Sequence, residues 1–151
     1  MLPVSYASHP IPTNILLWAH YANGHRGACL RFDAHSGIFE YAQEVCYSGS
    51  CKIFKATEVY NHAQEAMESA ILTKAEGWRY EQEWRVFQPN QAGMFASFQP
   101  RELTAVILGC AASAEDHRRV RSWLAQRCEP LQLLAARRRS AESYELEINP
   151  V

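Results

Sequence analysis

The spacing of hydrophobic residues predicts three helices in this chain. Apolar side chains recur at helical intervals in residues 14–22, in residues 57–75 and in residues 113–127. The third segment opens with Ser113 and Asp116, three positions apart, a spacing that resembles a capping box. We therefore expect one short helix near the start, one long helix in the middle and one capped helix near the end.

Alternating and continuous apolar runs predict the strands. Residues 27–33 and 38–47 are expected to pair as a hairpin, because the link between them is short and contains glycine. The continuous run at residues 103–108 is typical of a strand covered on both faces. Further strands are predicted at residues 131–135 and 144–148, the last at a sheet edge.

The order of these elements predicts an α+β fold. A strand, a helix and a second strand follow one another between residues 103 and 135, which favours a parallel crossover. No repeat, low-complexity segment or linker interrupts the chain. We expect residues 1–151 to form a single domain with a mixed, mainly antiparallel sheet, about three helices and one C-terminal βαβ crossover.

The segment Trp78–Phe87 has the strongest chemical asymmetry. If it is one strand, its alternate residues fall on an aromatic face and on a charged face that contains Glu81 and Glu83. Residues 94–99 are expected to return as its antiparallel partner. The charged face should then meet solvent or line a pocket.

Composition and charge restrict the classes of function. Hydrophobic residues make up 48% of the chain and charged residues 21%, as in ordinary globular proteins. The net charge of -1 gives no general attraction to nucleic acid or to an anionic membrane. Five cysteines without CxxC spacing, and no secretory signal or membrane span, predict free thiols and a cytoplasmic location.

Glu81 and Glu83 are the candidate catalytic residues. Two carboxylates on one strand face repel each other, which raises the pKa of a carboxyl group and suits general acid–base chemistry. The alternative is an outer face of salt bridges, because Arg79 and Arg85 flank the pair and neutralise it. Arg85 is also a candidate ligand-binding residue.

A second candidate site lies in the segment from Leu16 to Gly27. It combines aromatic, imidazole and guanidinium groups, a mixture that suits a planar phosphorylated ligand. The alternative is an amphipathic helix whose aromatic residues pack in the core. The candidate ligand-binding residues are Trp18, His20, Tyr21, His25 and Arg26.

No metal site is predicted from the histidines or cysteines. His20 and His25 are five positions apart, so they do not share a helix face as an HExxH pair does. The chain also lacks a GxSxG elbow and any cysteine in a familiar catalytic motif.

Two motifs make the chain resemble the bacterial domain-of-unknown-function family numbered 2971. The first is LWAHYANGHRGACLRF, from Leu17 to Phe32, and the second is W-x-Y-E-x-E-x-R, from Trp78 to Arg85. Lys74 and the strand end Ile107-Leu108-Gly109 also fit the family pattern. The family name carries no activity. Members usually have a further acidic segment upstream, so the resemblance implies an N-terminally shortened member.

The Glu-x-Glu spacing is also similar to ADP-ribosyltransferase-like folds. That resemblance implies a catalytic Glu83 that stabilises an oxocarbenium-like transition state, with Glu81 positioning the acceptor.

From the sequence as a whole, we expect a non-catalytic ligand-binding or interaction module that self-associates as a homo-oligomer. It has no expected cofactor and takes a small phosphorylated ligand. The alternative is an NAD- or nucleotide-using transferase or hydrolase with Glu83 as the catalytic acid.

Overall fold

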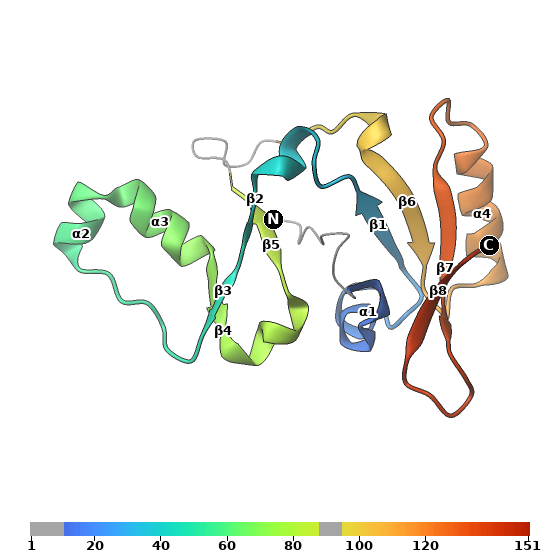
Figure 1. Cartoon of the computed structure of the whole chain (residues 1–151), viewed down its shortest axis with the longest axis horizontal. Coiled ribbons are helices and arrows are strands. Elements are labelled where there is room, and N and C mark those ends of the chain that lie inside the picture. Colours follow the sequence, from blue (N-terminus) through green and yellow to red (C-terminus); the bar gives the residue numbers. More distant parts are fainter. Residues whose placement is uncertain (1–10, 88–94) are drawn as a thin grey trace. The chain divides into compact units, whose positions relative to one another are not determined.

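The chain divides into two compact units. A computed structural model describes residues 11–87 and 95–151 (Figure 1). Among these residues, unit 1 comprises residues 38–87 and 95–97, and unit 2 comprises residues 11–37 and 98–151. The predicted α+β class is confirmed, whereas the single-domain organisation stays a prediction.

Unit 2 is built on a four-stranded mixed sheet. The strand order is β1 (Ala28–Phe32), β6 (Leu103–Leu108), β7 (Gln132–Arg138) and β8 (Leu146–Pro150). Strands β6 and β7 are parallel, and the two outer pairs are antiparallel. The mixed, mainly antiparallel sheet and the edge position of the last strand are therefore as predicted.

The parallel pair is joined through helix α4 (Ala114–Leu124), which confirms the predicted crossover. Ser113 is the N-cap of α4: its Oγ accepts from the Asp116 amide at 3.1 Å, and an Asp116 carboxylate oxygen accepts from the Ser113 amide at 3.1 Å. This reciprocal bonding satisfies two amides that a helix start leaves without intrahelical partners. The helix forms where the sequence predicts because its cap is local.

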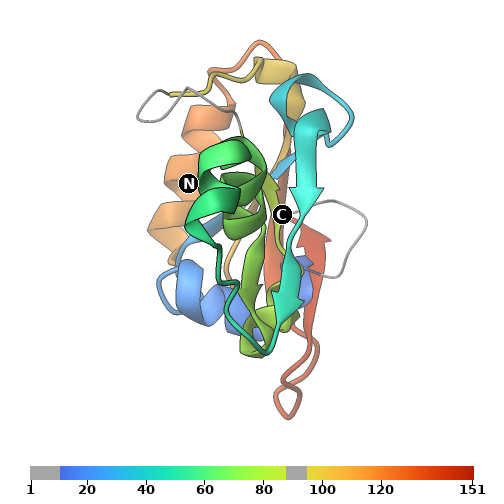
Figure 2. The ribbon, with the colours of Figure 1, turned by 90° about the vertical axis from the view of Figure 1, so that its left-hand side faces the viewer.

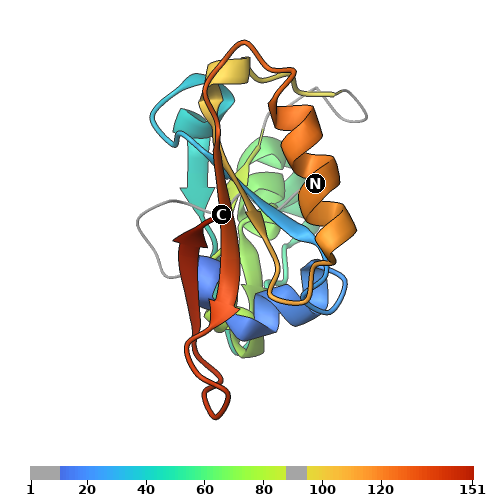
Figure 3. The ribbon, with the colours of Figure 1, turned by 90° about the vertical axis from the view of Figure 1, so that its right-hand side faces the viewer.

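The core of unit 2 lies between the sheet and helix α1 (Ile15–Tyr21). Trp18 of α1 packs against Ile107 of β6, Ala136 of β7 and Leu146 of β8, and all four side chains are buried. The short 3-10 helix η1 (Ile11–Thr13) precedes α1, and η4 (Pro100–Glu102) leads into β6. Figures 1 and 3 show α1 and α4 on opposite sides of the sheet.

Unit 1 contains two short strand pairs and two short helices. Strands β2 (Ala42–Glu44) and β5 (Trp84–Val86) are antiparallel, and β3 (Cys46–Ser48) and β4 (Thr73–Ala75) are parallel. Between β3 and β4 lie α2 (Ala56–Asn61) and α3 (Ala63–Ile71), drawn in green in Figure 2. The 3-10 helices η2 (Gly37–Tyr41) and η3 (Glu76–Glu81) complete this part of the chain.

The predicted hairpin between residues 27–33 and 38–47 is wrong. Residues 37–41 form η2, in which Phe39 is buried, and β1 pairs with the distant β6 instead. The short glycine-containing link after residue 33 favours pairing with residues 38–47, the nearest segment along the chain, but β1 does not pair there. Strand β6 is more apolar, and pairing with it places β1 beside the best-buried strand in the described part of unit 2.

The predicted long helix over residues 57–75 is two helices and a strand. His62 separates α2 from α3 with φ -138° and ψ 48°, which is not a helical conformation. Lys74, expected on the helix, lies on β4 instead. The sequence predicts three helices, and the described residues form four α-helices. The difference arises because the single predicted helix covers both α2 and α3.

The segment Trp78–Phe87 is not one strand. Its first part is the 3-10 helix η3, Gln82 adopts a left-handed conformation with φ 46°, and only β5 is extended. The pairing explains this difference. Strand β4 runs parallel to β3, whereas β5 runs antiparallel to β2, which directly precedes β3 along the chain. The chain must therefore reverse between β4 and β5, and η3 is that reversal.

The expected partner strand at residues 94–99 is also wrong for its described part. Residues 95–99 have no regular secondary structure, and β5 pairs with β2. Position 94 lies outside the described residues.

Candidate functional site

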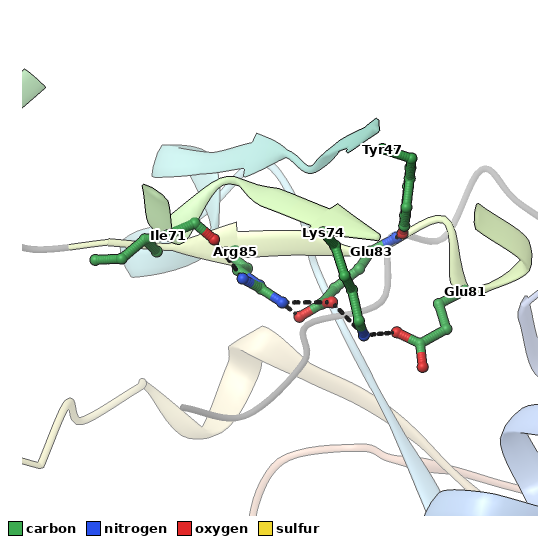
Figure 4. Close-up of polar contacts among 6 residues, drawn as sticks. All are labelled: Tyr47, Ile71, Lys74, Glu81, Glu83 and Arg85. Carbon is green, nitrogen blue, oxygen red and sulfur yellow. Dashed lines mark hydrogen bonds and ion pairs between the residues drawn. The ribbon is translucent and has the colours of Figure 1, made fainter. Parts of the chain in front are cut away.

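Glu81 and Glu83 meet at one lysine. Both side chains are buried, with 5% and 7% of their surface exposed, and both accept hydrogen bonds from the Lys74 ammonium group (Figure 4). The Lys74 Nζ to Glu83 Oε2 distance is 3.1 Å. Lys74 comes from β4, Glu81 from the end of η3, and Glu83 from the residue before β5. The reversal through η3 thus brings the three groups together.

Arg85 completes an ion-pair cluster with Lys74, Glu81 and Glu83. Its Nε donates to Glu83 Oε1 at 2.7 Å, and its Nη2 donates to Glu83 Oε2 at 2.9 Å. Its Nη1 donates to the Ile71 carbonyl oxygen, so the guanidinium group also holds the end of α3 (Figure 4). Both oxygens of Glu83 therefore accept from cations, in the bidentate geometry that makes arginine–carboxylate pairs strong.

The cluster keeps Lys74, Glu83 and Arg85 charged. Burial raises the pKa of Glu83, but hydrogen bonds from Arg85 and Lys74 outweigh burial and lower it. Burial likewise lowers the pKa of Lys74, and its bonds to Glu81 and Glu83 reverse the direction and raise it. The bond to Glu83 raises the pKa of Arg85. Glu83 is thus an ionised hydrogen-bond acceptor at neutral pH.

Tyr47 and Trp78 contact the ion-pair cluster. The Tyr47 hydroxyl accepts from the Glu83 amide at 2.8 Å, and burial is the main cause that raises the pKa of Tyr47. The Trp78 ring centroid lies 5.1 Å from Lys74 Nζ, within cation–π range. Sequence reasoning missed the roles of Lys74 and Tyr47. The sequence predicts Lys74 on a helix. Tyr47 lies 36 positions before Glu83, and the β3–β4 pairing brings Tyr47 to the cluster.

Unit 1 also contains a hollow of about 310 Å³. Its lining includes the hydroxyl-bearing residues Ser48, Ser50 and Thr73, together with Lys52 and Phe54. Neither Glu81 nor Glu83 lines this hollow.

Strand alternation separates the hollow from the ion-pair cluster. Lys74 pairs with Tyr47 across β3 and β4, so their side chains share one face, and the flanking Ser48 and Thr73 point to the other. Lys74 also borders the hollow, although its ammonium group belongs to the cluster. The same strand pair therefore carries an ionic face and a hydroxyl-rich face.

The N-terminal candidates all lie in unit 2. Trp18 is 3% exposed, and its Nε1 donates to the Pro12 carbonyl oxygen at 2.7 Å, so its indole forms part of the core. His20 and Tyr21 are exposed near the end of α1, with their rings in an edge-to-face contact at 6.3 Å. The predicted site residues thus divide between the two units.

His25 and Arg26 lie in the loop that follows α1. Asn23, Gly24 and His25 all have positive φ, at 48°, 58° and 67°. His25 is half-buried and its Nδ1 lies 3.7 Å from the Sγ of Cys110, whereas Arg26 is exposed. The thiol–imidazole contact joins residues 85 positions apart, and no local motif in the sequence indicated it.

The described residues contain neither a metal-ligand cluster nor a membrane-spanning helix. Within residues 11–87 and 95–151, no three histidine, cysteine or acidic side chains are grouped so that they could hold a metal ion. None of the helices in this part of the chain has the length and apolar character needed to cross a membrane.

The comparisons with known proteins agree with the motifs. Residues 17–86 match the family model described as Protein of unknown function (DUF2971), which confirms the predicted family resemblance. The matched segment contains the loop of His25 and the whole ion-pair cluster. No curated protein and no solved structure matches the chain.

Proposed function

We propose that this chain is a non-catalytic module that binds a small phosphorylated ligand in the hollow of unit 1. The observation that carries the proposal is the lining of that hollow, which contains three hydroxyl-bearing residues together with Lys52. Its volume of about 310 Å³ suits a small ligand.

The side chains of the hollow are chemically suited to a phosphate group. Hydroxyl groups donate hydrogen bonds to phosphate oxygens, and a lysine supplies a positive point charge. Lys52 Nζ donates to Ser69 Oγ, and the Thr73 hydroxyl donates to the Ser69 carbonyl oxygen at 2.6 Å. Ser48 and Ser50 are held in one turn, in which the Ser50 amide donates to Ser48 Oγ at 3.2 Å.

Phe54 gives the hollow an apolar portion. Its half-buried ring lines the same space as Lys52, and an aromatic ring offers a surface on which a planar group can stack. A ligand with a ring at one end and a phosphate at the other would contact both Phe54 and the polar side chains of the hollow.

The ion-pair cluster supports a binding role over a catalytic one. An acid catalyst must carry a proton, but Glu83 is held ionised and both of its oxygens accept from Arg85 or Lys74. The alternative, an NAD- or nucleotide-using transferase with Glu83 as the catalytic acid, requires this arrangement to open. NAD is proposed as a cofactor only under that alternative.

Thermal unfolding with pyrophosphate, ADP and adenosine tests the proposal. A ligand that binds only the folded state raises the melting temperature by mass action. We expect a rise with millimolar pyrophosphate and ADP, and a smaller rise with adenosine, which lacks the phosphates.

Lys52→Gln should abolish the rise that pyrophosphate causes. Lys55→Gln is the matched control, because Lys55 carries the same charge three positions later but does not line the hollow. No rise in the wild type, or an equal rise in both variants, would overturn the proposal. Release of nicotinamide from NAD, lost in Glu83→Gln, would instead support the enzyme alternative.

Self-association and a cytoplasmic location, which the sequence also predicts, stay predictions. Sedimentation equilibrium of the full chain measures the first directly.

A further inference from the structure

Cys110 and His25 form a thiol–imidazole pair in unit 2. The Cys110 Sγ lies 3.7 Å from His25 Nδ1, within the range for a hydrogen bond that involves sulfur. Nδ1 accepts the thiol proton in the tautomer that carries its own hydrogen on Nε2.

The backbone fixes both members of the pair. The Ala111 amide donates to the His25 carbonyl oxygen at 3.0 Å, and the Gly109 amide donates to the Gly27 carbonyl oxygen at 2.9 Å. Cys110 lies between the two donating residues, so its Cα cannot move away from the loop while these bonds persist.

Access distinguishes this thiol from a buried structural cysteine. Cys110 is exposed, whereas Cys29 is half-buried and burial raises the pKa of its thiol. Cys46, Cys51 and Cys128 are exposed as well, but within the described residues no imidazole lies at hydrogen-bond distance from them. Within residues 11–87 and 95–151, Cys110 is thus the exposed thiol that has an imidazole beside it.

We propose that Cys110 is the reactive thiol of this chain, with His25 as its base, and that small disulfides modify it by S-thiolation. A thiolate is the nucleophile in thiol–disulfide exchange, and an adjacent imidazole generates it by taking the proton.

The exchange balances without another reactant. His25 Nδ1 takes the proton from Cys110 Sγ, and the thiolate attacks one sulfur of the small disulfide. A new disulfide bond forms to Cys110 while the original bond breaks, and the departing thiolate takes the proton from His25. Cys110 is oxidised, and one half of the small disulfide is reduced to a free thiol.

The first test compares the five cysteines of the wild-type chain. The native protein is treated briefly with glutathione disulfide, the remaining thiols are blocked with an alkylating reagent, and each cysteine-containing peptide is quantified by mass spectrometry. Cys110 should carry most of the glutathione. Faster modification of Cys46, Cys51 or Cys128 would overturn the proposal, and this comparison needs no substitution.

The second test removes the base. His25→Asn keeps a residue that tolerates positive φ, and we expect it to slow the reaction of Cys110 with an aromatic disulfide by about tenfold. His35→Asn, which changes an exposed histidine elsewhere in unit 2, should leave the rate unchanged.

In denaturant the Cys110 rates of wild type and His25→Asn should coincide, because the pair exists only in the folded chain. An unchanged rate in folded His25→Asn, or a difference that persists in denaturant, would contradict the role of His25.

Discussion

Gly109 lies directly against the backbone of His25. A Cβ at Gly109 would come within 2.1 Å of the His25 carbonyl oxygen and 2.7 Å of its carbonyl carbon. The loop after α1 can therefore close onto the end of β6 only if residue 109 has no side chain. The sequence shows a glycine after an apolar strand, and the structure gives the physical reason for it.

Gly109→Ala should destabilise the protein by about 1–3 kcal/mol, the usual cost of forcing an extra carbon into a packed site. Both of the nearest atoms belong to the backbone, so no side chain can rotate out of the way. Urea unfolding followed by circular dichroism measures the loss. Gly77→Ala is the control, because a Cβ at Gly77 meets nothing within 4 Å. Equal losses in the two variants would contradict the close approach.

Glu83→Gln should lower the free energy of unfolding by about 3 kcal/mol, because it leaves Arg85 without the carboxylate that accepts from it. Guanidinium unfolding provides the measurement. Glu76→Gln removes a carboxylate from a largely exposed pair with Arg79 and should leave stability close to that of the wild type. Near-wild-type stability in Glu83→Gln would instead point to a residue held for chemistry.

The contribution of Glu83 to stability should disappear in acid. Its pKa in the folded state is lower than its ordinary value of 4.5, so its stabilising effect is complete above that pH. The effect is lost as the pH falls through the folded-state pKa. The stability difference between wild type and Glu83→Gln should therefore be constant near neutral pH and shrink below about pH 4.5. A difference that grows in acid would contradict this sign.

Lys74 sets the alkaline limit of the same cluster. Its pKa in the folded state is raised above 10.5, so its contribution is complete below that pH and is lost as the pH rises through the folded-state value. Lys74→Met should therefore destabilise the protein equally at pH values near 6 and 9. Urea unfolding at both values tests this, and a cost that is halved at the higher pH would show that Lys74 is not held charged.

Ser113→Ala should destabilise the protein by about 1 kcal/mol through loss of the N-cap of α4. The same change should raise the pKa of Asp116, which the hydrogen bonds from the Ser113 side chain and backbone hold below its usual range. Thermal unfolding measures the first effect, and a carboxyl titration followed by NMR measures the second. Ser122→Ala, at an exposed interior position of the same helix, should show neither.

Elements with local causes were predicted well. Helix α4 has its cap within three residues, and β6 is a continuous apolar run, so each is encoded in a short stretch of sequence. The crossover between β6 and β7 follows from their order. The hairpin and the strand at Trp78–Phe87 were wrong because β1 and η3 depend on pairing with segments that are distant in the sequence. The long helix was wrong because the backbone at His62 is not helical.

The candidate site shows the same division. The sequence predicts Glu81, Glu83 and Arg85 as candidate site residues, and a salt-bridged arrangement is one interpretation of their spacing. It could not supply Tyr47, whose hydroxyl reaches the Glu83 amide through the β3–β4 pairing, nor the contact between Cys110 and His25. Each of these contacts requires backbone pairing between segments that are far apart.

By itself, the sequence determined the α+β class, the mixed sheet with its crossover, the free cysteines and the family resemblance. These depend on periodicity, capping and motifs, which act over a few residues. Only the tertiary structure decided which cation each carboxylate meets, which histidine each thiol meets and which side chains line the hollow. Such pairs form when distant segments fold together to bury apolar surface, and a buried charge is then stable only where that folding provides a counter-ion.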